Sequence, residues 1–198
     1  MKRNKLKIAI TGGIASGKST VSSILENLGY PVYSADKIYA DLLKITDVII
    51  ACSEIVGIEP LILEDRLEFD RERARKIVFE NDCIRAELNK YTHRIVYMTI
   101  DEIFDKCSED KPVFFEIPLL FESGKENDFD RVIVVFRDKE DRLESIQKRD
   151  LRTREESEKI IKSQFDYNKL DKNKHTIIYN DSDIKSLELK VGKMLENL

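Results

Sequence analysis

The chain has 198 residues, of which 41% are hydrophobic and 36% are charged, and its formal net charge is -4. This length and apolar content are sufficient for one domain with a buried core. The acidic balance does not favour nucleic acid or an anionic membrane surface as a partner, and no apolar run approaches the length of a transmembrane helix.

The spacing of the cysteines indicates neither a disulfide-bonded protein nor a zinc protein. Cys52, Cys83 and Cys107 are scattered along the chain, and no C-x-x-C pair occurs. This pattern predicts reduced thiols in a cytoplasmic protein. It does not indicate a disulfide framework or a zinc site.

Strand signals and helix signals alternate along the chain. Helices are expected over Lys18–Leu28, directly after Asp36, and from about Asp183. Because several of the strand runs are almost continuously apolar, we expect parallel strands that are covered on both faces. The alternation predicts an α/β fold with a doubly wound five-stranded parallel sheet. The five predicted strands are Leu6–Ile10, Pro31–Asp36, Pro112–Pro118, Arg131–Phe136 and His175–Asn180.

Two regions depart from this alternation. Residues 47–108 lack strand runs and predict successive helices, and two charged helical stretches, Lys139–Arg149 and Thr153–Asn168, separate the fourth and fifth strands. We therefore expect a single domain over residues 1–198, with helical insertions at about 47–108 and about 138–168.

The segment TGGIASGKST, Thr11 to Thr20, follows the first predicted strand and precedes a predicted helix. Its spacing fits G-x-x-x-x-G-K-[ST], in which glycines allow successive backbone N–H groups to face phosphate oxygens. Lys18 is placed to reach the β- and γ-phosphates, and the Ser19 hydroxyl suits Mg²⁺. A flexible Gly/Ser turn is disfavoured by the strand–loop–helix context. The nucleotide-binding residues expected here are Gly13, Ile14, Ala15, Ser16, Gly17, Lys18, Ser19 and Thr20.

Two acidic residues lie near the ends of predicted strands, where ligands bind in open α/β sheets. Asp36 ends the second strand and is a candidate for accepting the proton of an attacking hydroxyl, with the N-cap of the next helix as the alternative. Glu116 lies in the third strand, where a carboxylate needs a partner. It is a candidate for orienting Mg²⁺ through water, and a salt bridge is the alternative.

Other candidates have equally open interpretations. The segment Pro118–Glu122 follows the third strand and suits either a substrate pocket or the core, while His93 and Arg71 are unremarkable in isolation. The two charged helices suit either a solvated surface or a flap over transferring phosphates. Their basic residues are Arg142, Lys148, Arg149, Arg152, Arg154 and Lys162.

Several longer segments carry a family resemblance: PVYSADKIYADLL, RLEFDRERARKIVFEND, THRIV, IPLLFES, KRDLRTREESEKIIKSQ and IIYND. Together with TGGIASGKST, they resemble the dephospho-coenzyme A kinase family of P-loop kinases over nearly the whole chain. The combination of the loop with PLLFE and with the spacing of Arg149, Asp150 and Gln164 is more specific than the loop alone. The chain departs from the family pattern at Ala15, Ser34, Arg94, Ser145, Lys174 and His175.

The resemblance implies a P-loop NTPase-type fold and transfer of the γ-phosphoryl group of ATP to the 3′-hydroxyl of dephospho-coenzyme A. It implies Asp36, Lys18 and Arg149 as catalytic residues, with Asp36 as base or orienter and Arg149 in a closing lid. ATP and Mg²⁺ are the implied cofactors, and a monomer or weak homo-oligomer is expected. The acceptor is expected at Asp36, Arg71, His93, Pro118, Leu119, Leu120 and Glu122.

Two rival functions share the phosphate-binding loop. One is another small P-loop kinase that acts on a nucleoside monophosphate or a small metabolite, and the other is a nucleotide-binding regulator without phosphotransfer. The dependence of ATP turnover on the acceptor that is supplied distinguishes the two rivals from each other and from a dephospho-coenzyme A kinase. A GTPase switch is disfavoured, because the N-K-x-D motif of Asn168–Asp171 follows a charged helix instead of a strand.

Overall fold

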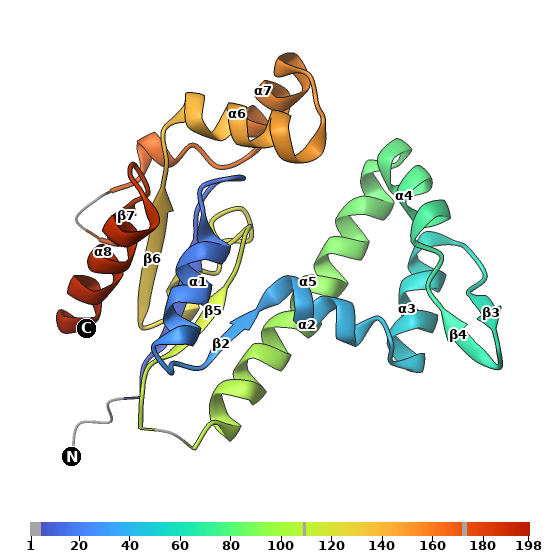
Figure 1. Cartoon of the computed structure of the whole chain (residues 1–198). Helices are drawn as coiled ribbons and strands as arrows, with labels where there is room; N and C mark the ends of the chain where they lie inside the picture. The colour runs from blue at the N-terminus through green and yellow to red at the C-terminus, as the bar shows by residue number, and fades with distance from the viewer. Residues whose placement is uncertain (1–4, 109, 172–173) are drawn as a thin grey trace. The chain divides into compact units, whose positions relative to one another are not determined.

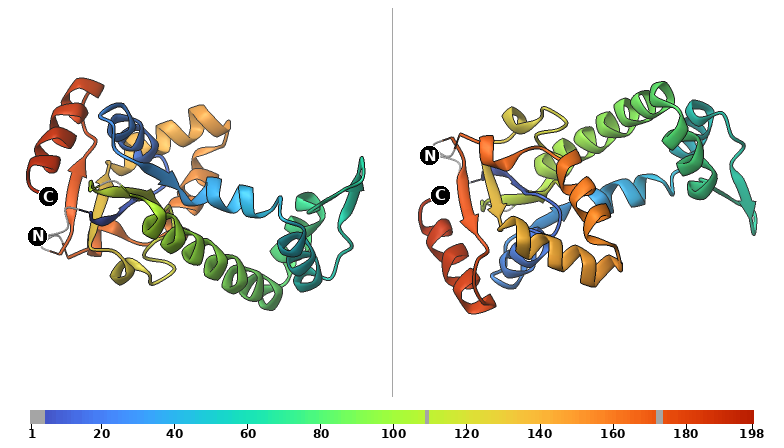
Figure 2. Two further views of the ribbon diagram at one scale, coloured as in Figure 1. Left: turned by 90° about the horizontal axis from the view of Figure 1, so that it is seen from below. Right: turned by 90° about the horizontal axis from the view of Figure 1, so that it is seen from above.

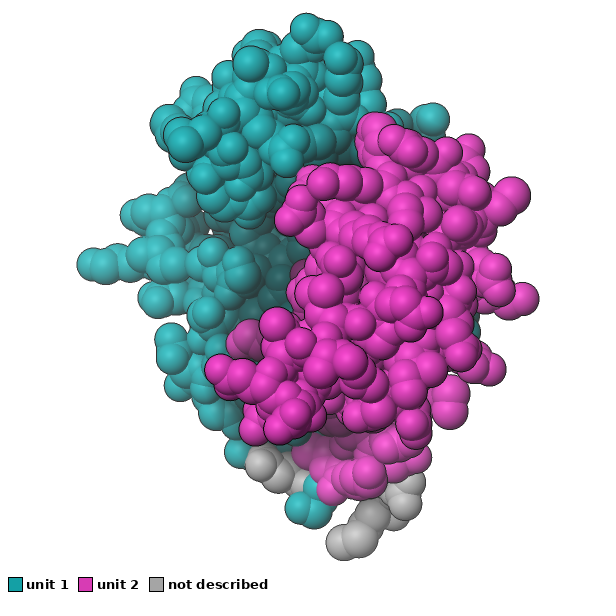
Figure 3. Space-filling view, turned by 90° about the vertical axis from the view of Figure 1, so that its right-hand side faces the viewer, with its two compact units in different colours: residues 1–34, 108–198 teal, residues 35–107 magenta. Residues whose placement is uncertain are grey.

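The computed structural model describes residues 5–108, 110–171 and 174–198 (Figure 1). The described chain forms two compact units, residues 1–34 with 108–198 (unit 1) and residues 35–107 (unit 2), which Figure 3 shows in different colours. Each unit has hydrophobic clusters of its own. Among the described helices, none is long and apolar enough to cross a membrane.

Unit 1 contains a five-stranded parallel sheet in the order β2-β5-β1-β6-β7. The central strand β1 lies between β5 and β6, so the chain builds the sheet outward in both directions from β1. This arrangement confirms the predicted α/β fold. The strands are β1 (Lys7–Thr11), β2 (Val32–Ser34), β5 (Val113–Glu116), β6 (Arg131–Phe136) and β7 (Thr176–Tyr179).

The helical elements of unit 1 are α1 (Lys18–Asn27), α6 (Lys139–Asp150), α7 (Arg154–Ser163) and α8 (Ile184–Glu196), with short 3-10 turns η1 (Glu126–Asp128) and η2 (Tyr167–Lys169). Helix α7 begins with a capping box between Thr153 and Glu156. The prediction that this helix continues to Asn168 was wrong, because α7 ends at Ser163 and the chain then turns toward the sheet.

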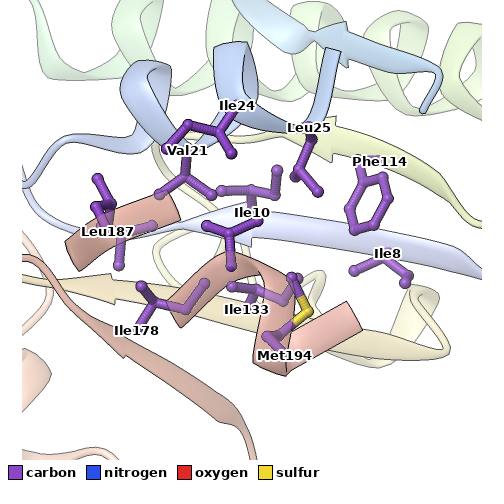
Figure 4. Close-up of a cluster of buried hydrophobic side chains, with 12 residues drawn as sticks. Ile8, Ile10, Val21, Ile24, Leu25, Phe114, Ile133, Ile178, Leu187 and Met194 are labelled. Atoms are coloured by element: carbon purple, nitrogen blue, oxygen red, sulfur yellow. The ribbon is translucent and has the colours of Figure 1, made fainter. Parts of the chain in front are cut away.

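The main core of unit 1 fills the space between one face of the sheet and the helices α1 and α8 (Figure 4). Val21 and Leu25 of α1 meet Leu187 and Val191 of α8 there, over fully buried strand residues such as Phe114. The apolar run of β1 is buried along its whole length. Burial on both faces explains why these strands are almost continuously apolar in the sequence.

Unit 2 consists of α2 (Ala35–Leu42), α3 (Thr46–Val56), a hairpin of β3 (Leu61–Leu63) and β4 (Arg66–Glu68), α4 (Arg71–Glu80) and α5 (Asp82–Lys106). Figure 2 shows α5 as one long helix, with α3 and α4 beside its N-terminal half. Leu88 of α5 packs in both apolar clusters of the unit. Cys52, Cys83 and Cys107 are free thiols, and burial raises the pKa of Cys52 to about 11.

Two predictions on residues 31–108 were wrong. Residues 47–108 are not all helical, because the antiparallel hairpin lies between α3 and α4. Its strands are three residues long, too short to produce a readable alternation, and Glu64 and Asp65 turn between them with positive φ angles of 47° and 65°. The second strand also ends earlier than expected, at Ser34, so Asp36 lies in the first turn of α2.

We predict that Phe114→Ala lowers the free energy of unfolding by about 3–5 kcal/mol, because it leaves a cavity at a fully buried ring that packs edge-to-face on Tyr30. Leu189→Ala, at a residue of α8 that is 69% exposed, is the control and is expected to change stability by less than about 0.5 kcal/mol. Urea denaturation followed by circular dichroism measures both. A loss below about 1 kcal/mol for Phe114→Ala would contradict the core assignment.

Candidate active site

The loop between β1 and α1 lies at the topological switch point of the sheet, because β5 pairs with one side of β1 and β6 with the other. Open α/β sheets bind ligands at this point. Three of its residues have positive φ angles: Gly12 at 151°, Ala15 at 58° and Gly17 at 96°. A Cβ atom on Gly12 would lie 2.3 Å from the carbonyl oxygen of Val135. The loop therefore needs glycine at Gly12 because the backbone of β6 passes so close to it.

Every carbonyl from Gly12 to Ser16 accepts a hydrogen bond from a side chain. The Lys18 ammonium donates to the carbonyls of Gly12, at 2.8 Å, and Gly13, at 3.0 Å. The next three carbonyls accept from residues distant in the sequence: Ile14 from Arg142 Nε at 2.8 Å, Ala15 from Arg137 Nη1 at 3.4 Å and Ser16 from Asn180 Nδ2 at 2.9 Å.

With its carbonyls bonded in this way, the loop presents backbone N–H groups. Those of Ala15, Gly17 and Ser19 donate to no residue in the described part of the chain. The Ser16 hydroxyl is buried and likewise has no partner among the described residues. Unpaired donors at the start of α1, where the helix dipole is positive, are suited to an anion such as a nucleotide phosphate.

The magnesium candidates are Ser19 and Glu116. Ser19 is exposed in the first turn of α1 and makes no hydrogen bond within the described residues, so its hydroxyl fits one ligand of a Mg²⁺ ion that keeps several waters. Glu116 ends β5, and its carboxylate accepts a hydrogen bond of 2.7 Å from the Ser22 hydroxyl of α1. The partner of this acid is thus a hydroxyl, and the alternative of a salt bridge is not seen among the described residues.

The chain after α7 supports the loop from another side. Gln164 Oε1 accepts hydrogen bonds from the Ile14 amide at 2.7 Å and from Arg142 Nη2 at 3.3 Å. The Tyr167 hydroxyl lies 3.4 Å from the Thr11 hydroxyl, and burial raises the pKa of Tyr167 to about 12. Arg142 covers Gly13 so closely that a Cβ there would lie 2.3 Å from its guanidinium. Burial also lowers the pKa of Arg142.

The segment Pro118–Glu122 forms a turn after β5. Leu120 is fully buried, whereas Leu119 is 44% exposed. Phe121 stacks on Phe165 with ring centroids 4.7 Å apart, and Glu122 Oε1 accepts a 2.9 Å hydrogen bond from the Phe165 amide. In this structure, Leu120 belongs to the core and Glu122 fixes the chain that follows α7. Their contact with an acceptor stays a prediction.

Arg149 lies in the last turn of α6, and its guanidinium forms a two-pronged pair with the neighbouring Asp150. Nε to Oδ1 is 2.8 Å and Nη2 to Oδ2 is 3.0 Å. The hydrogen bond to Asp150 raises the pKa of Arg149. The side chain is 61% exposed, so it is free to turn toward a bound anion.

Three further candidates belong to unit 2. Asp36 is exposed in the first turn of α2, within the helix, so it is not the N-cap that its sequence position also allowed. Arg71 begins α4. Burial raises the pKa of Tyr39 on α2, and the positive charge of Arg71 offsets part of that rise. His93 is half-buried on α5, and burial lowers its pKa.

The sequence alone did not indicate that Arg137, Asn180 and Tyr167 support the loop. Arg142 was predicted only as one of several basic residues on the charged helices. Arg137 and Asn180 come directly after β6 and β7. The rule that ligands bind beyond the carboxyl ends of parallel strands could have selected both of them. Tyr167 carries no such signal, because its position depends on how the chain returns from α7.

We predict that Ala15→Gly does not lower the melting temperature. Relief of a left-handed alanine, worth about 1–2 kcal/mol, offsets the backbone entropy cost of glycine, about 0.5–1 kcal/mol. The control is Ala86→Gly on α5, where a regular helix is expected to lose about 1 kcal/mol. Thermal unfolding by circular dichroism compares the two. An equal drop for both variants would show that Ala15 carries no strain.

The comparisons with known proteins agree with this geometry. A family model described as dephospho-CoA kinase matches residues 6–186. A dephospho-CoA kinase of Fusobacterium nucleatum is 39% identical over 191 residues, which cover 96% of this chain and 97% of the relative. A dephospho-CoA kinase of Bacillus cereus is 34% identical over 192 residues, with 96% and 95% of the two chains covered.

Solved structures show the same similarity. A dephospho-CoA kinase from Campylobacter jejuni superposes with a TM-score of 0.73 at 31% identity, and the match covers 98% of this chain and 96% of that one. A protein from Thermus thermophilus has a TM-score of 0.81 at 27% identity, with 98% of both chains covered. The family model and the relatives span nearly the whole chain, including the phosphate loop and the helices after β6. The chain belongs to the dephospho-CoA kinase family.

Proposed function

We propose that this protein transfers the γ-phosphoryl group of ATP to the 3′-hydroxyl of dephospho-CoA, giving CoA and ADP. The observation that carries the proposal is the phosphate loop, whose carbonyls are bonded from Gly12 to Ser16 and whose N–H groups face outward unpaired at Ala15, Gly17 and Ser19. Phosphoryl transfer requires little covalent chemistry from a protein. It requires placement of the phosphates and neutralisation of their charge.

Lys18 is the cation that we propose for neutralising the phosphates at the loop. Its ammonium lies on the carbonyls of Gly12 and Gly13, within the loop that receives the phosphates. From there it can move to the β- and γ-phosphate oxygens and neutralise the charge that develops during transfer. Ser19 is the residue that would hold Mg²⁺, which supplies further charge neutralisation when it is bound.

Asp36 is the proposed base or orienter for the attacking 3′-hydroxyl. Its carboxylate is exposed, and the structure commits it to no hydrogen bond with another described residue. A carboxylate in this state can accept the proton as the new bond to phosphorus forms. We propose that the acceptor contacts Arg71, His93 and the Pro118–Glu122 turn. Arg71 offers a two-pronged donor for its diphosphate.

Arg149 is the proposed lid charge. In this structure its guanidinium donates two hydrogen bonds to the Asp150 carboxylate, and the side chain stays exposed. Exchange of that carboxylate for the transferring phosphoryl group would place a planar donor on the developing charge. We further propose a cytoplasmic location, which fits the three free thiols, and a monomer or weak homo-oligomer.

Acceptor-dependent ADP formation tests the function. We predict that ATP turnover in a coupled assay rises with dephospho-CoA and does not rise with AMP, CMP, shikimate or gluconate. Stimulation by one of the other acceptors would assign the protein to a different kinase activity. Absence of any acceptor effect would indicate a nucleotide-binding regulator.

We predict that Asp36→Asn lowers kcat at least about a hundredfold with little change in the KM for dephospho-CoA, because the amide keeps the size of the side chain and loses its basicity. The matched control is Asp41→Asn on the same helix, where the carboxylate pairs with Lys44 at the surface. Steady-state kinetics with both substrates varied measure the two variants. A near-normal kcat for Asp36→Asn would remove its catalytic assignment.

We predict that Arg149→Lys lowers kcat at least about tenfold, since lysine retains the charge and loses the two-pronged geometry that suits a phosphoryl group. Arg154→Lys is the control, because Arg154 also pairs with a carboxylate, that of Glu140, and lies on the adjoining helix α7. The same kinetics apply to both. Equal losses in the two variants would mean that the effect comes from lid stability and not from contact with phosphate.

A further inference from the structure

A hollow of about 460 Å³ lies within unit 1, between the end of β6, the start of α6 and the chain from the end of α7 through η2. Its volume is within the range of small-molecule sites, about 300–1,000 Å³. No residue of the phosphate loop lines it. The loop residues proposed to receive the ATP phosphates, Gly13 to Thr20, therefore lie outside its lining.

Part of the wall of the hollow is aromatic. Phe136, at the end of β6, is half-buried there, and Phe165 and Tyr167 follow α7. The latter two rings meet edge-to-face with centroids 5.3 Å apart. This packing orients Phe165 and Tyr167, and Phe136 is held by edge-to-face packing on Tyr179. Fixed aromatic rings of this kind provide a surface for a planar ring, such as a nucleotide base.

Two lysine side chains at the edge of the hollow form no ion pair with a described carboxylate. Lys139, in the first turn of α6, and Lys162, in the last turn of α7, make no ion pair with any residue in 5–108, 110–171 or 174–198. The two acids of the lining are already engaged. Asp138 accepts the Glu140 amide at the start of α6, and Asp166 accepts the Asn168 amide and pairs with Lys169.

Arg142 connects this hollow to the phosphate loop. It lines the hollow, and its Nε donates to the carbonyl of Ile14 while Nη2 donates to Gln164. Gln164 also lines the hollow and accepts the Ile14 amide. Nη1 of Arg142 makes no hydrogen bond within the described part of the chain. One residue of the loop, Ile14, is thus held at both its N–H and its carbonyl by residues that line the hollow.

We propose that the hollow binds a second nucleotide, a phosphate ester of a planar base, and that its occupancy changes the affinity of the loop for ATP. The base would stack on the Phe136 and Phe165 wall, and the phosphate would pair with Lys139 and Lys162. A phosphate there also attracts the guanidinium of Arg142. Displacement of Arg142 would release the Ile14 carbonyl, so that the loop becomes less ordered and binds ATP more weakly.

The probe is AMP, titrated calorimetrically into the whole protein that has been saturated with ADP. We expect one AMP to bind while ADP occupies the loop, and ADP affinity to fall at least about fivefold when AMP is present. The test depends on nucleotide binding alone, so its outcome is separate from that of the turnover assay.

Paired variants locate the AMP. In Lys139→Ser/Lys162→Ser, AMP affinity is expected to fall at least about tenfold, because both rim charges are removed. The control is Lys148→Ser/Lys159→Ser, which removes two lysines from the same helices, α6 and α7, that pair with Glu144 and Glu155 outside the hollow. This control is expected to keep wild-type AMP affinity.

Three results would overturn the proposal. AMP binding that ADP abolishes would place AMP in the ATP site. Binding that is equal in the two double variants would place it in another site, such as that of the acceptor. Binding with no effect on ADP affinity would exclude the connection through Arg142.

Discussion

The orientation of the peptide groups between Gly12 and Ser16 is the constraint on which the site depends. An anion can bind to this loop only if the N–H groups face it, and the carbonyls must then find donors elsewhere. The donors are Lys18 from α1, Arg142 and Arg137 from the region after β6, and Asn180 from the end of β7. The order of strands beside β1 brings these residues to one edge of the sheet.

This constraint also explains why sequence elements far from the loop belong to the same site. Helix α6 supplies Arg142, and the chain that follows α7 supplies Gln164 and Tyr167. Loss of the Arg142 donor would leave the Ile14 carbonyl unpaired, and loss of the Gln164 acceptor would leave the Ile14 amide unpaired, each at a cost of about 1–3 kcal/mol in a partly buried position. The helices after β6 therefore contribute to the order of the loop as well as to any closure over it.

The sequence predicted the sheet, its parallel strands and the phosphate loop, because each has a local signal. The strands read as apolar runs since both faces are covered, and the loop needs glycine where β6 passes within 2.3 Å of a Cβ position. The hairpin of β3 and β4 could not be predicted, because its strands have three residues each and its apolar side chains, such as Ile62, are exposed. The family resemblance indicated Arg149 and Asp36 but gave no indication of Arg137, whose role depends on a contact across the fold.

The residues proposed for phosphoryl transfer are divided between the two units. Unit 1 carries the phosphate loop and the Pro118–Glu122 turn, and unit 2 carries Asp36 and Arg71, which are also proposed for the acceptor. Unit 2 has apolar clusters of its own, so the helices that carry Asp36 and Arg71 are held by packing that is separate from the packing around the loop. This division fits a kinase in which the same phosphate loop serves whichever hydroxyl the second unit presents.

The position of the new phosphate on the product distinguishes transfer to the 3′-hydroxyl from every other outcome. After incubation with ATP and dephospho-CoA, phosphorus-31 and proton NMR identify the carbon that bears the added phosphoryl group. We expect a single new phosphomonoester coupled to the ribose proton at carbon 3′, formed in equal amount with ADP. A phosphate at carbon 2′, or ADP formed with free inorganic phosphate and no phosphorylated product, would contradict it.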